Sequence, residues 1–340
     1  MSVTIKDIAR KVGVSIATVS MVINNKDSRI SDRTKRKIND AVKELNYHPN
    51  LAARSLMTSE TKTVGLIIPD VSNPFFADYS KNLDSRLSQQ QYSLFLCNSN
   101  NNMEKEENYL SELINRNVDA LVISSVNIEE LSGTELFREV KIPILLFDRK
   151  LNSSNINTIS IDNFHGGYLA ARELVQNHHT DICCISGSFR LDNIRARFEG
   201  FRQYLAESGL SFDGESLFEG ELTLEHGYRS AKEIVRRKNE KNYTAIFCTN
   251  DLIALGVYKA FREEGVRIPE DVSIVGFDNV EFTDYLSPPL TTVAQPVREL
   301  GEKSADIVVS LLSGNRVNEP LCLPVALVRR ASVAEKKDAP

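Results

Sequence analysis

The strongest constraint on the fold is a repeating alternation of apolar runs, polar turns and amphipathic stretches that begins after Lys62. Continuous runs of Val, Ile, Leu and Phe are typical of strands in a parallel sheet that helices cover on both faces. The runs predicted as strands are 64–69, 92–97, 119–123, 142–147, 182–185, 245–248 and 272–277. They are too many for one comfortable open sheet, so we expect an α/β region with two similar doubly wound lobes.

The first 46 residues have a different pattern, with three short helices that each have a start signal. Thr4 opens a capping-box-like sequence, and Gly13 ends the first helix. Ser15 and Ser31 are predicted to cap the second and third helices. Two helices separated by a few residues around a glycine, with a third to complete the core, are typical of a helix-turn-helix unit. Any small three-helix bundle is the alternative.

Charge is divided unevenly between these two regions. The whole chain has a net charge of −5, but residues 1–62 contain 12 Lys and Arg against 6 Asp and Glu. The remaining residues contain 29 Lys and Arg against 40 Asp and Glu. A basic head on an acidic body indicates that only the head meets nucleic acid.

The cysteines and the apolar runs bear on where the protein works. The five cysteines form no Cys-x-x-Cys pair, and four of them lie within apolar runs, which predicts reduced, buried thiols in a cytosolic protein. No apolar run approaches the roughly 18 residues of a membrane span. The first residues lack the apolar core of a signal peptide. We therefore expect a soluble, cytoplasmic protein.

Motifs of the common doubly wound enzymes are missing from the sequence. There is no Gly-x-Gly-x-x-Gly, P-loop, Gly-x-Ser-x-Gly or metal-spaced set of His and Cys. We expect no catalysis, no metal and no cofactor. A solute-binding protein of a transport system would share the two lobes, but it would need a signal peptide and would have no use for residues 1–62.

Several motifs together resemble the lac/gal repressor family, over essentially the whole chain. They are Thr4-Ile-Lys-Asp-Ile-Ala-Arg10, Val14-Ser-Ile-Ala-Thr-Val-Ser20, Leu45-Asn-Tyr-His-Pro-Asn-Leu-Ala-Ala-Arg-Ser-Leu56, Val64-Gly-Leu-Ile-Ile-Pro-Asp70, Asn73-Pro-Phe-Phe76, Thr249-Asn-Asp-Leu-Ile-Ala-Leu-Gly256 and Val275-Gly-Phe-Asp278. The resemblance implies a helix-turn-helix head at 1–48, a hinge helix and linker at 49–62, and a two-lobed effector-binding and dimerisation domain at 63–332. That domain would be of the periplasmic-binding-protein-like type I fold.

The resemblance also implies that the chain crosses between the lobes three times. Lobe one would contain about 63–160 and 292–322, and lobe two about 161–291 and 323–332. Residues 333–340, polar and charged at their end, are expected to form a flexible tail. The implied molecule is a homodimeric repressor that binds double-stranded operator DNA and responds to a small sugar.

The predicted second helix contains short polar side chains and no charge. Ser15, Thr18, Ser20 and Asn24, together with Thr4, can donate hydrogen bonds to phosphates, although helix capping and solvation would explain them equally. The resemblance places Ile16, Ala17 and Met21 against the base edges. An arginine is common in the family where this chain has Met21, which can contact only apolar groups such as a thymine methyl.

The segment after Pro49 is the second element predicted to bind DNA. Its short helix is too small to be stable alone. The resemblance implies that it becomes ordered on the operator, with Leu56 entering the minor groove as a wedge. The other residues of this segment expected at the DNA are Asn50, Ala53 and Arg54. An ordinary linker is the alternative.

Polar and aromatic residues gather at the predicted strand ends, where ligands of such sheets bind. A sugar requires hydrogen-bonding groups for its hydroxyls and aromatic rings for its apolar face. The expected effector residues, which resemble the contact set of ribose-binding proteins, are Asn73, Phe75, Phe76, Asp148, Arg149, Arg197, Asn250, Phe277, Asp278 and Gln295.

Structural roles remain open for several of these residues. The alternatives are that Asp278 or Asn250 caps the following helix, that Phe75 is a core residue, and that Arg195 or Arg197 lies on a solvated helix face. The segment 218–222, where a further aromatic contact is expected, does not match clearly. Two arginines leave room for a sugar phosphate.

Overall fold

The computed structural model describes residues 3–23, 29–47, 60–148, 156–315 and 320–336. The chain divides into two compact units, residues 1–61 and 62–340. No described helix combines the length and the apolarity that crossing a membrane requires.

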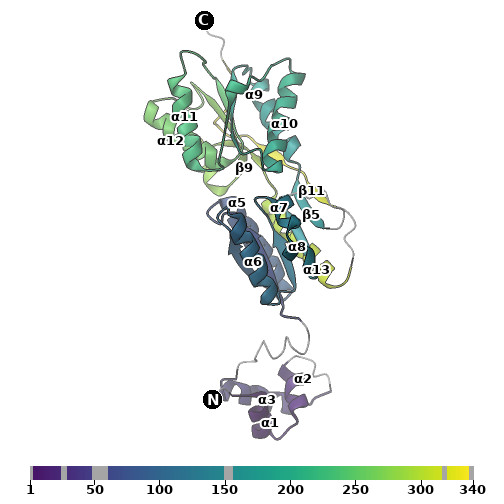
Figure 1. The fold of residues 1–340 in the computed structure, drawn as a ribbon. Helices are drawn as coiled ribbons and strands as arrows, with labels where there is room; N and C mark the ends of the chain where they lie inside the picture. Colours follow the sequence, from purple (N-terminus) through teal and green to yellow (C-terminus); the bar gives the residue numbers. More distant parts are fainter. Residues whose placement is uncertain (1–2, 24–28, 48–59, 149–155, 316–319, 337–340) are drawn as a thin grey trace. The chain divides into compact units, whose positions relative to one another are not determined.

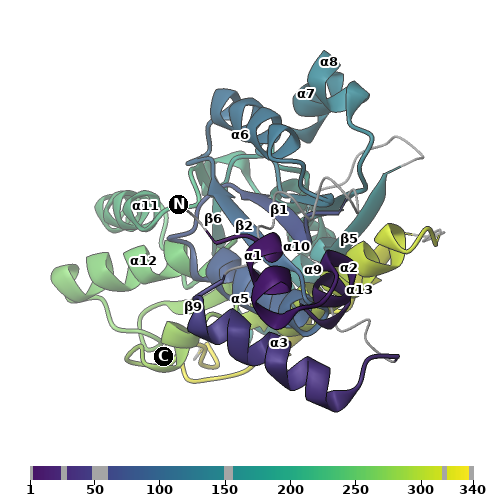
Figure 2. The ribbon, with the colours of Figure 1, turned by 90° about the horizontal axis from the view of Figure 1, so that it is seen from below.

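The first unit contains the three predicted helices, α1 (Ile5–Val12), α2 (Ile16–Ile23) and α3 (Asp32–Glu44), shown in Figure 2. The predicted signals delimit them. The carboxylate of Asp7 accepts hydrogen bonds from the backbone N–H and the hydroxyl of Thr4, and Gly13 ends α1 with a left-handed φ of 75°. Ser15 Oγ accepts from the N–H of Thr18 at 3.0 Å. The helices enclose a small core centred on fully buried Ile8, Val19 and Ile38.

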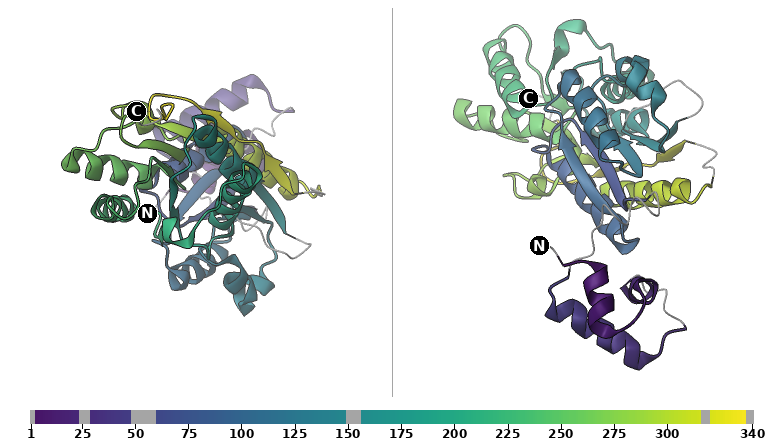
Figure 3. Two further views of the ribbon diagram at one scale, coloured as in Figure 1. Left: turned by 90° about the horizontal axis from the view of Figure 1, so that it is seen from above. Right: turned by 60° about the horizontal axis from the view of Figure 1, so that its bottom comes forward.

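The second unit contains two six-stranded sheets. Figures 1 and 3 show the sheets with the helices that pack on them. The first sheet has the order β11 (Leu321–Leu323), β5 (Asn157–Ile161), β4 (Ile144–Phe147), β3 (Ala120–Ile123), β1 (Thr63–Ile68) and β2 (Ser93–Asn98). The second has the order β12 (Ala326–Val328), β10 (Thr291–Ala294), β9 (Ser273–Asp278), β8 (Ala245–Cys248), β6 (Ile182–Gly187) and β7 (Leu217–Gly220). Every strand pair among the described residues is parallel except β10 with β12. The two predicted α/β lobes are confirmed.

Helices cover both faces of each sheet. The helices of the first lobe are α5 (Pro74–Gln89) and α13 (Val297–Leu312) on one face, and α6 (Met103–Asn115), α7 (Ile128–Gly133) and α8 (Glu135–Glu139) on the other. Those of the second lobe are α9 (Asn163–Gln176) and α10 (Asp192–Glu207) on one face, and α11 (Leu224–Arg236) and α12 (Asp251–Glu264) on the other. Two 3₁₀ turns, Gly214–Ser216 and Glu281–Asp284, complete this lobe. The residues of the interior strands β3 and β8 are buried from both sides, and their sequences are continuously apolar.

Two glycines allow α9 and α10 to pack closely. A Cβ atom on Gly167 would lie 1.7 Å from the carbonyl oxygen of Arg197, and one on Gly200 would lie 1.8 Å from that of Phe164. Any side chain at either position would therefore push the helices apart. This close packing fixes the position of Arg197 of α10 relative to α9.

One predicted crossing between the lobes is misplaced. The chain was predicted to cross back to lobe one at residue 292. In the structure, β10 (Thr291–Ala294) still pairs with β9 in the second sheet. The chain returns only after Ala294, where α13 begins to pack on α5. Because Thr291 and Thr292 are polar, their pattern did not indicate a buried strand there.

The prediction of a flexible tail from residue 333 is wrong for residues 333–336. Ser332 is fully buried, and its carbonyl accepts from the N–H of Ile274 at 2.8 Å. The carbonyl of Ala334 hydrogen-bonds His179 Nε2 at 3.0 Å, and the N–H of Lys336 donates to the carbonyl of Asn177 at 2.9 Å. Backbone hydrogen bonds hold this segment, and composition does not report them.

The cysteines are only partly as predicted. Cys183, Cys184 and Cys248 are buried and free, and burial raises the pKa of each thiol. Cys97 is half-buried, and Cys322 is exposed because it lies on the edge strand β11. The expectation of a buried thiol is therefore wrong for Cys322.

Candidate functional site

The outer face of α2 carries the residues predicted to read DNA. Ile16 and Met21 are 45% and 41% exposed, which is high for large apolar side chains, and Ala17 and Ser15 are also exposed. Thr18 and Ser20 are half-buried, and Thr4 is exposed at the start of α1. The Ser15 and Thr18 hydroxyls hydrogen-bond each other at 2.8 Å, so capping and an exposed polar face coexist. Asn24, Asn50, Ala53, Arg54 and Leu56 lie outside the described residues.

A cleft of about 960 Å³ lies between the two lobes at the carboxyl ends of their strands. Eight of the ten predicted effector residues line it: Asn73, Phe75, Phe76, Asp148, Arg197, Asn250, Asp278 and Gln295. Arg149 lies outside the described residues. The structure thus brings together, around one cleft, most of the residues that the family resemblance and the strand-end rule had indicated; that they bind an effector stays a prediction.

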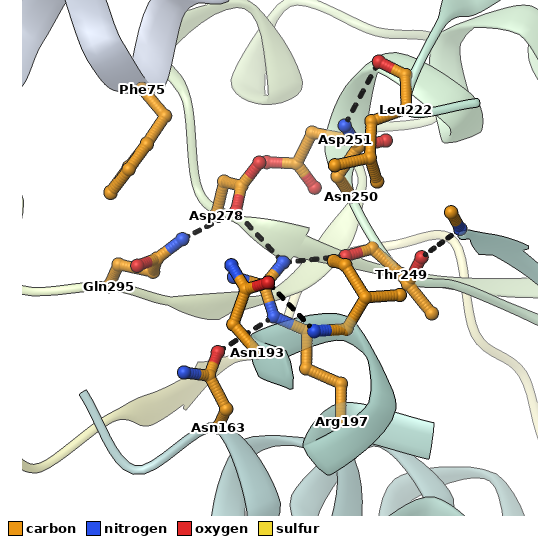
Figure 4. Close-up of polar contacts among 12 residues, drawn as sticks. Phe75, Asn163, Asn193, Arg197, Leu222, Thr249, Asn250, Asp251, Asp278 and Gln295 are labelled. Atoms are coloured by element: carbon orange, nitrogen blue, oxygen red, sulfur yellow. Dashed lines mark hydrogen bonds and ion pairs between the residues drawn. The ribbon is translucent and has the colours of Figure 1, made fainter. Parts of the chain in front are cut away.

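Arg197 is the central polar residue of the cleft wall in Figure 4, and it is only 3% exposed. Its Nε donates to Asn163 Oδ1 at 2.9 Å, and one terminal nitrogen donates to the carbonyl of Thr249 at 2.7 Å. The same nitrogen lies 3.5 Å from Asp278 Oδ1. Arg197 is therefore a fixed, buried cation and not a residue of a solvated helix face.

Phe277 differs from its prediction. Its ring is fully buried and does not line the cleft; the Arg197 guanidinium covers it, with 3.7 Å from Cζ to the ring centroid. A Cβ on Gly166 would lie 2.6 Å from this ring, so the ring is also packed from behind. Phe277 supports Arg197 through a cation–π contact, and the expected stacking on a ligand ring is not possible in this arrangement.

Asp278 and Gln295 form the adjoining part of the wall. Gln295 Nε2 donates to Asp278 Oδ1 at 2.6 Å. Gln295 Oε1 is buried and has no hydrogen-bond partner among the described residues. Burial raises the pKa of Asp278 to about 6, opposed by the Arg197 charge and the Gln295 hydrogen bond. The pair thus offers acceptor oxygens to a ligand that has hydrogen-bond donors.

Asp251, at the start of α12, is a second buried carboxylate next to Asp278. It accepts from the hydroxyl of Thr292 at 2.7 Å and from the N–H of Val280 at 3.0 Å. Burial and then the charge of Asp278 raise its pKa. Asp251 therefore fixes the backbone that follows β9, and with it the position of Asp278.

The first lobe contributes the aromatic side of the cleft. Asn73 caps α5, since its Oδ1 accepts from the N–H of Phe75 at 3.1 Å. The rings of Phe75 and Phe76 meet edge to face at 5.1 Å, and Figure 4 shows Phe75 extending from α5 toward the Asp278 cluster. Both rings are core residues as well as cleft residues. Asp148 accepts from Asn193 Nδ2 at 2.9 Å, a hydrogen bond that joins the lobes.

Comparison with known proteins agrees with both units. Residues 4–50 match the model of bacterial regulatory proteins of the lacI family, and residues 171–333 match a periplasmic binding protein-like domain. The HTH-type transcriptional repressor PurR of Aliivibrio fischeri strain MJ11 is 36% identical over 306 residues, which cover 90% of each chain. The chain belongs to the lacI family of bacterial regulatory proteins.

Solved structures of the lacI family share the fold. The lac repressor dimer bound to operator and the anti-inducer ONPF superposes with a TM-score of 0.88, at 28% identity over 98% of this chain and 100% of that one. A LacI family transcriptional regulator from Enterococcus faecalis V583 with bound ribose has a TM-score of 0.72, at 36% identity over 81% of this chain and 100% of that one. The first unit is thus the DNA-binding head of a lacI-family regulator, and the second is its ligand-binding domain.

The sequence prediction missed Asn193, which lines the cleft, and Asn163, which does not line it but supports Arg197. Asn163 and Asn193, in the first turns of α9 and α10, orient Arg197 and Asp148. Residues 220–223, at the end of β7 and just after it, also line the cleft, and three of them belong to the segment 218–222 that did not match the family pattern clearly. Asn250 lines the cleft and caps α12, since its Oδ1 accepts from the N–H of Ile253 at 2.9 Å. No sequence signal separates these roles, because helix caps and ligand contacts use the same residue types.

Proposed function

We propose that this protein is a dimeric transcription repressor of sugar-utilisation genes whose operator affinity is controlled by a neutral sugar, ribose or a related aldose, in the cleft. The observation that carries the proposal is the buried Arg197–Asp278–Gln295 cluster facing Phe75 and Phe76 across one cavity. Fixed donors and acceptors beside aromatic rings are what a polyhydroxylated ring requires. The similarity to repressors and to a ribose-bound regulator supports it.

Hydrogen-bond capacity favours a ligand with hydroxyl donors. Gln295 Oε1 is a buried acceptor without a partner among the described residues, and Asp278 is an acceptor beside it. A buried acceptor left unpaired costs about 1–3 kcal/mol. A sugar hydroxyl that donates to Gln295 would remove this cost, so binding gains more than the contact alone.

The balance of charge argues against a sugar phosphate. The described lining of the cleft contains five carboxylates and two arginines: Asp70, Glu130, Asp148, Glu221, Asp278, Arg190 and Arg197. Arg197 already contacts Asp278 and the Thr249 carbonyl. A phosphate dianion would therefore enter a cleft whose described lining is net negative. Of the two arginines in that lining, Arg197 is already paired with Asp278. Sugar phosphates remain the second ligand class to test.

Exposed apolar residues support the dimer. Phe95 and Leu96, on the edge strand β2, are 42% and 41% exposed, and Val71 is 42% exposed. Tyr285, in the second lobe, is 79% exposed. An uncovered apolar edge strand promotes association with another chain unless a partner covers it. We infer that a second copy covers these residues, as two-fold symmetric binding to a near-palindromic operator requires.

Titration calorimetry tests the ligand. The full-length protein would be titrated with ribose, other aldoses, ribose 5-phosphate and a purine base, which is planar and carries N–H donors. We expect ribose or another neutral aldose to bind and ribose 5-phosphate to bind at least tenfold more weakly, given the charge of the cleft. Operator binding would then be measured with and without the sugar that binds. A purine base or a phosphate as the tighter ligand would overturn the sugar assignment and leave the regulator class in place.

A further inference from the structure

Glu106 of α6 is a fully buried carboxylate that does not line the cleft. Oε1 accepts from the N–H of Val126 at 3.0 Å and from the hydroxyl of Ser99 at 3.2 Å. Oε2 accepts from the hydroxyl of Ser125. A buried charge is retained only where such donors compensate its lost hydration. These donors come from two separate loops, so Glu106 connects segments that no strand pairing joins at this point.

The sheet order explains what this connection does. β1 lies between β2 and β3, and Ser99 follows β2 whereas Ser125 follows β3. Strands two positions apart in a sheet are separated by roughly 10 Å. The two oxygens of one carboxylate therefore join the loops on both sides of β1 and fix the distance between them.

These two loops form part of the wall of the cleft in the first lobe. Asn100 and Asn101 come from the loop after β2, and Val126 and Asn127 come from the loop after β3. The connection continues one step further, because Ser125 Oγ also accepts from the N–H of Asn127 at 3.1 Å. Glu106 thus acts on cleft residues through Ser99, Ser125 and the backbone.

We propose that Glu106 is a positioning residue of the effector cleft, which sets the spacing of the two loops without touching the ligand. The inference depends on the proposed function, because it concerns the same cleft. The carboxylate accepts from both loops at once, and the N–H of Val126 among its partners can only donate. A glutamine at this position would turn an N–H₂ group toward a serine hydroxyl, which would have to reverse from donor to acceptor, so the connection to that loop would weaken.

The test compares Glu106→Gln and the milder Ser125→Ala with a matched control. Glu173→Gln alters another buried carboxylate, which contacts Arg329 Nε at 2.7 Å in the second lobe and does not line the cleft. Hydrogen exchange of the full-length protein is measured first, since it needs no ligand. We expect faster exchange at residues 99–102 and 124–127 in both test variants and unchanged exchange there in Glu173→Gln.

Ribose affinity and operator affinity without ribose are measured next. Glu106→Gln should weaken ribose binding about tenfold or more, as loss of a buried hydrogen-bonded support implies, and leave ligand-free operator affinity unchanged. Exchange at both loops that is unaltered in both test variants overturns the inference, whatever ligand the protein binds. Altered exchange with unchanged ribose affinity also overturns it. If wild type binds no sugar, the proposed function fails while the exchange result still decides whether Glu106 fixes the loops.

Discussion

Replacing Asp278 with asparagine should make the ligand-free protein more stable at neutral pH. Burial raises the pKa of Asp278 from 3.8 to about 6, even though Arg197 and Gln295 oppose the shift. Each unit of pKa corresponds to about 1.4 kcal/mol, so the ionised carboxylate destabilises the folded state by up to about 3 kcal/mol. The asparagine side chain would have no charge and would keep an oxygen for Gln295 Nε2.

The sign with pH follows from linkage. Between pH 3.8 and 6, Asp278 is protonated in the folded state and ionised in the unfolded state. The unfolded state therefore binds fewer protons, and stability falls as pH rises through this window. The gain from Asp278→Asn should reach its full value above pH 6 and shrink toward zero as pH falls below 4.

Urea unfolding at pH 7.5 and at the lowest pH where the protein stays folded measures this difference. Asp271→Asn is the control with the opposite sign, because its hydrogen bonds with Arg267 lower the pKa of Asp271 to about 2. That variant should lose stability above pH 4. If Asp278→Asn is instead less stable than wild type at pH 7.5 and this loss shrinks at the lower pH, Arg197 stabilises the ionised carboxylate and the argument from burial is refuted. Ribose binding should weaken in Asp278→Asn at either pH.

Three further predictions concern the head, the dimer and the C-terminal segment. Met21→Arg should add a preference for guanine at the facing base pair, worth about 1–3 kcal/mol, because wild type presents only an apolar side chain there. Binding-site selection measures this preference, and an equally strong preference for guanine in wild type would show that Met21 does not contact that base. Tyr285→Asp should shift sedimentation from dimer toward monomer, since it places a charge on the exposed apolar surface of lobe two, and an unchanged dimer would exclude that surface. Truncation after Ala331 should reduce the free energy of unfolding by about 3 kcal/mol or more through loss of the Ser332, Ala334 and Lys336 hydrogen bonds; unchanged urea unfolding would show that this segment is dispensable.

Six of the seven strands that the sequence predicted are interior, and the seventh, β2, is an apolar edge strand. The strands that it missed have polar residues or lie at edges. β3 and β8 read as continuous apolar runs because helices bury both of their faces. β5 (Asn157–Ile161) and β10 (Thr291–Ala294) contain Asn, Ser and Thr, yet they are almost wholly buried. Tertiary packing decides their state, and composition does not reveal it. The three-residue strands β11 and β12 are too short for any periodic signal.

The site shows the same division between local and long-range information. Strand ends predicted which residues gather at the cleft, because the carboxyl ends of parallel strands share one edge of a sheet. Which neighbour each side chain contacts depended on helix packing. Phe277 was predicted to stack on the ligand, but Arg197 covers its ring in the structure. The close contact between α9 and α10 places Arg197 there. Glu106 had no signal at all, since a glutamate in a polar helix reads as a solvated residue.

The cleft contains polar groups that a ligand can pair, and this pairing can favour one arrangement of the two lobes over another. Asp278 carries an unfavourable charge, and Gln295 has an acceptor without a partner among the described residues. The Asp148–Asn193 hydrogen bond joins the lobes directly. A sugar whose hydroxyls satisfy Gln295 and Asp278 in one lobe arrangement stabilises that arrangement selectively, because in any other arrangement those groups stay unsatisfied. Differential affinity of this kind is the only way in which a ligand can shift an equilibrium. The sign of the response at the operator then depends on which lobe arrangement the DNA-bound head favours, so sugar binding to the full-length protein with and without operator DNA reports the same coupling from both directions.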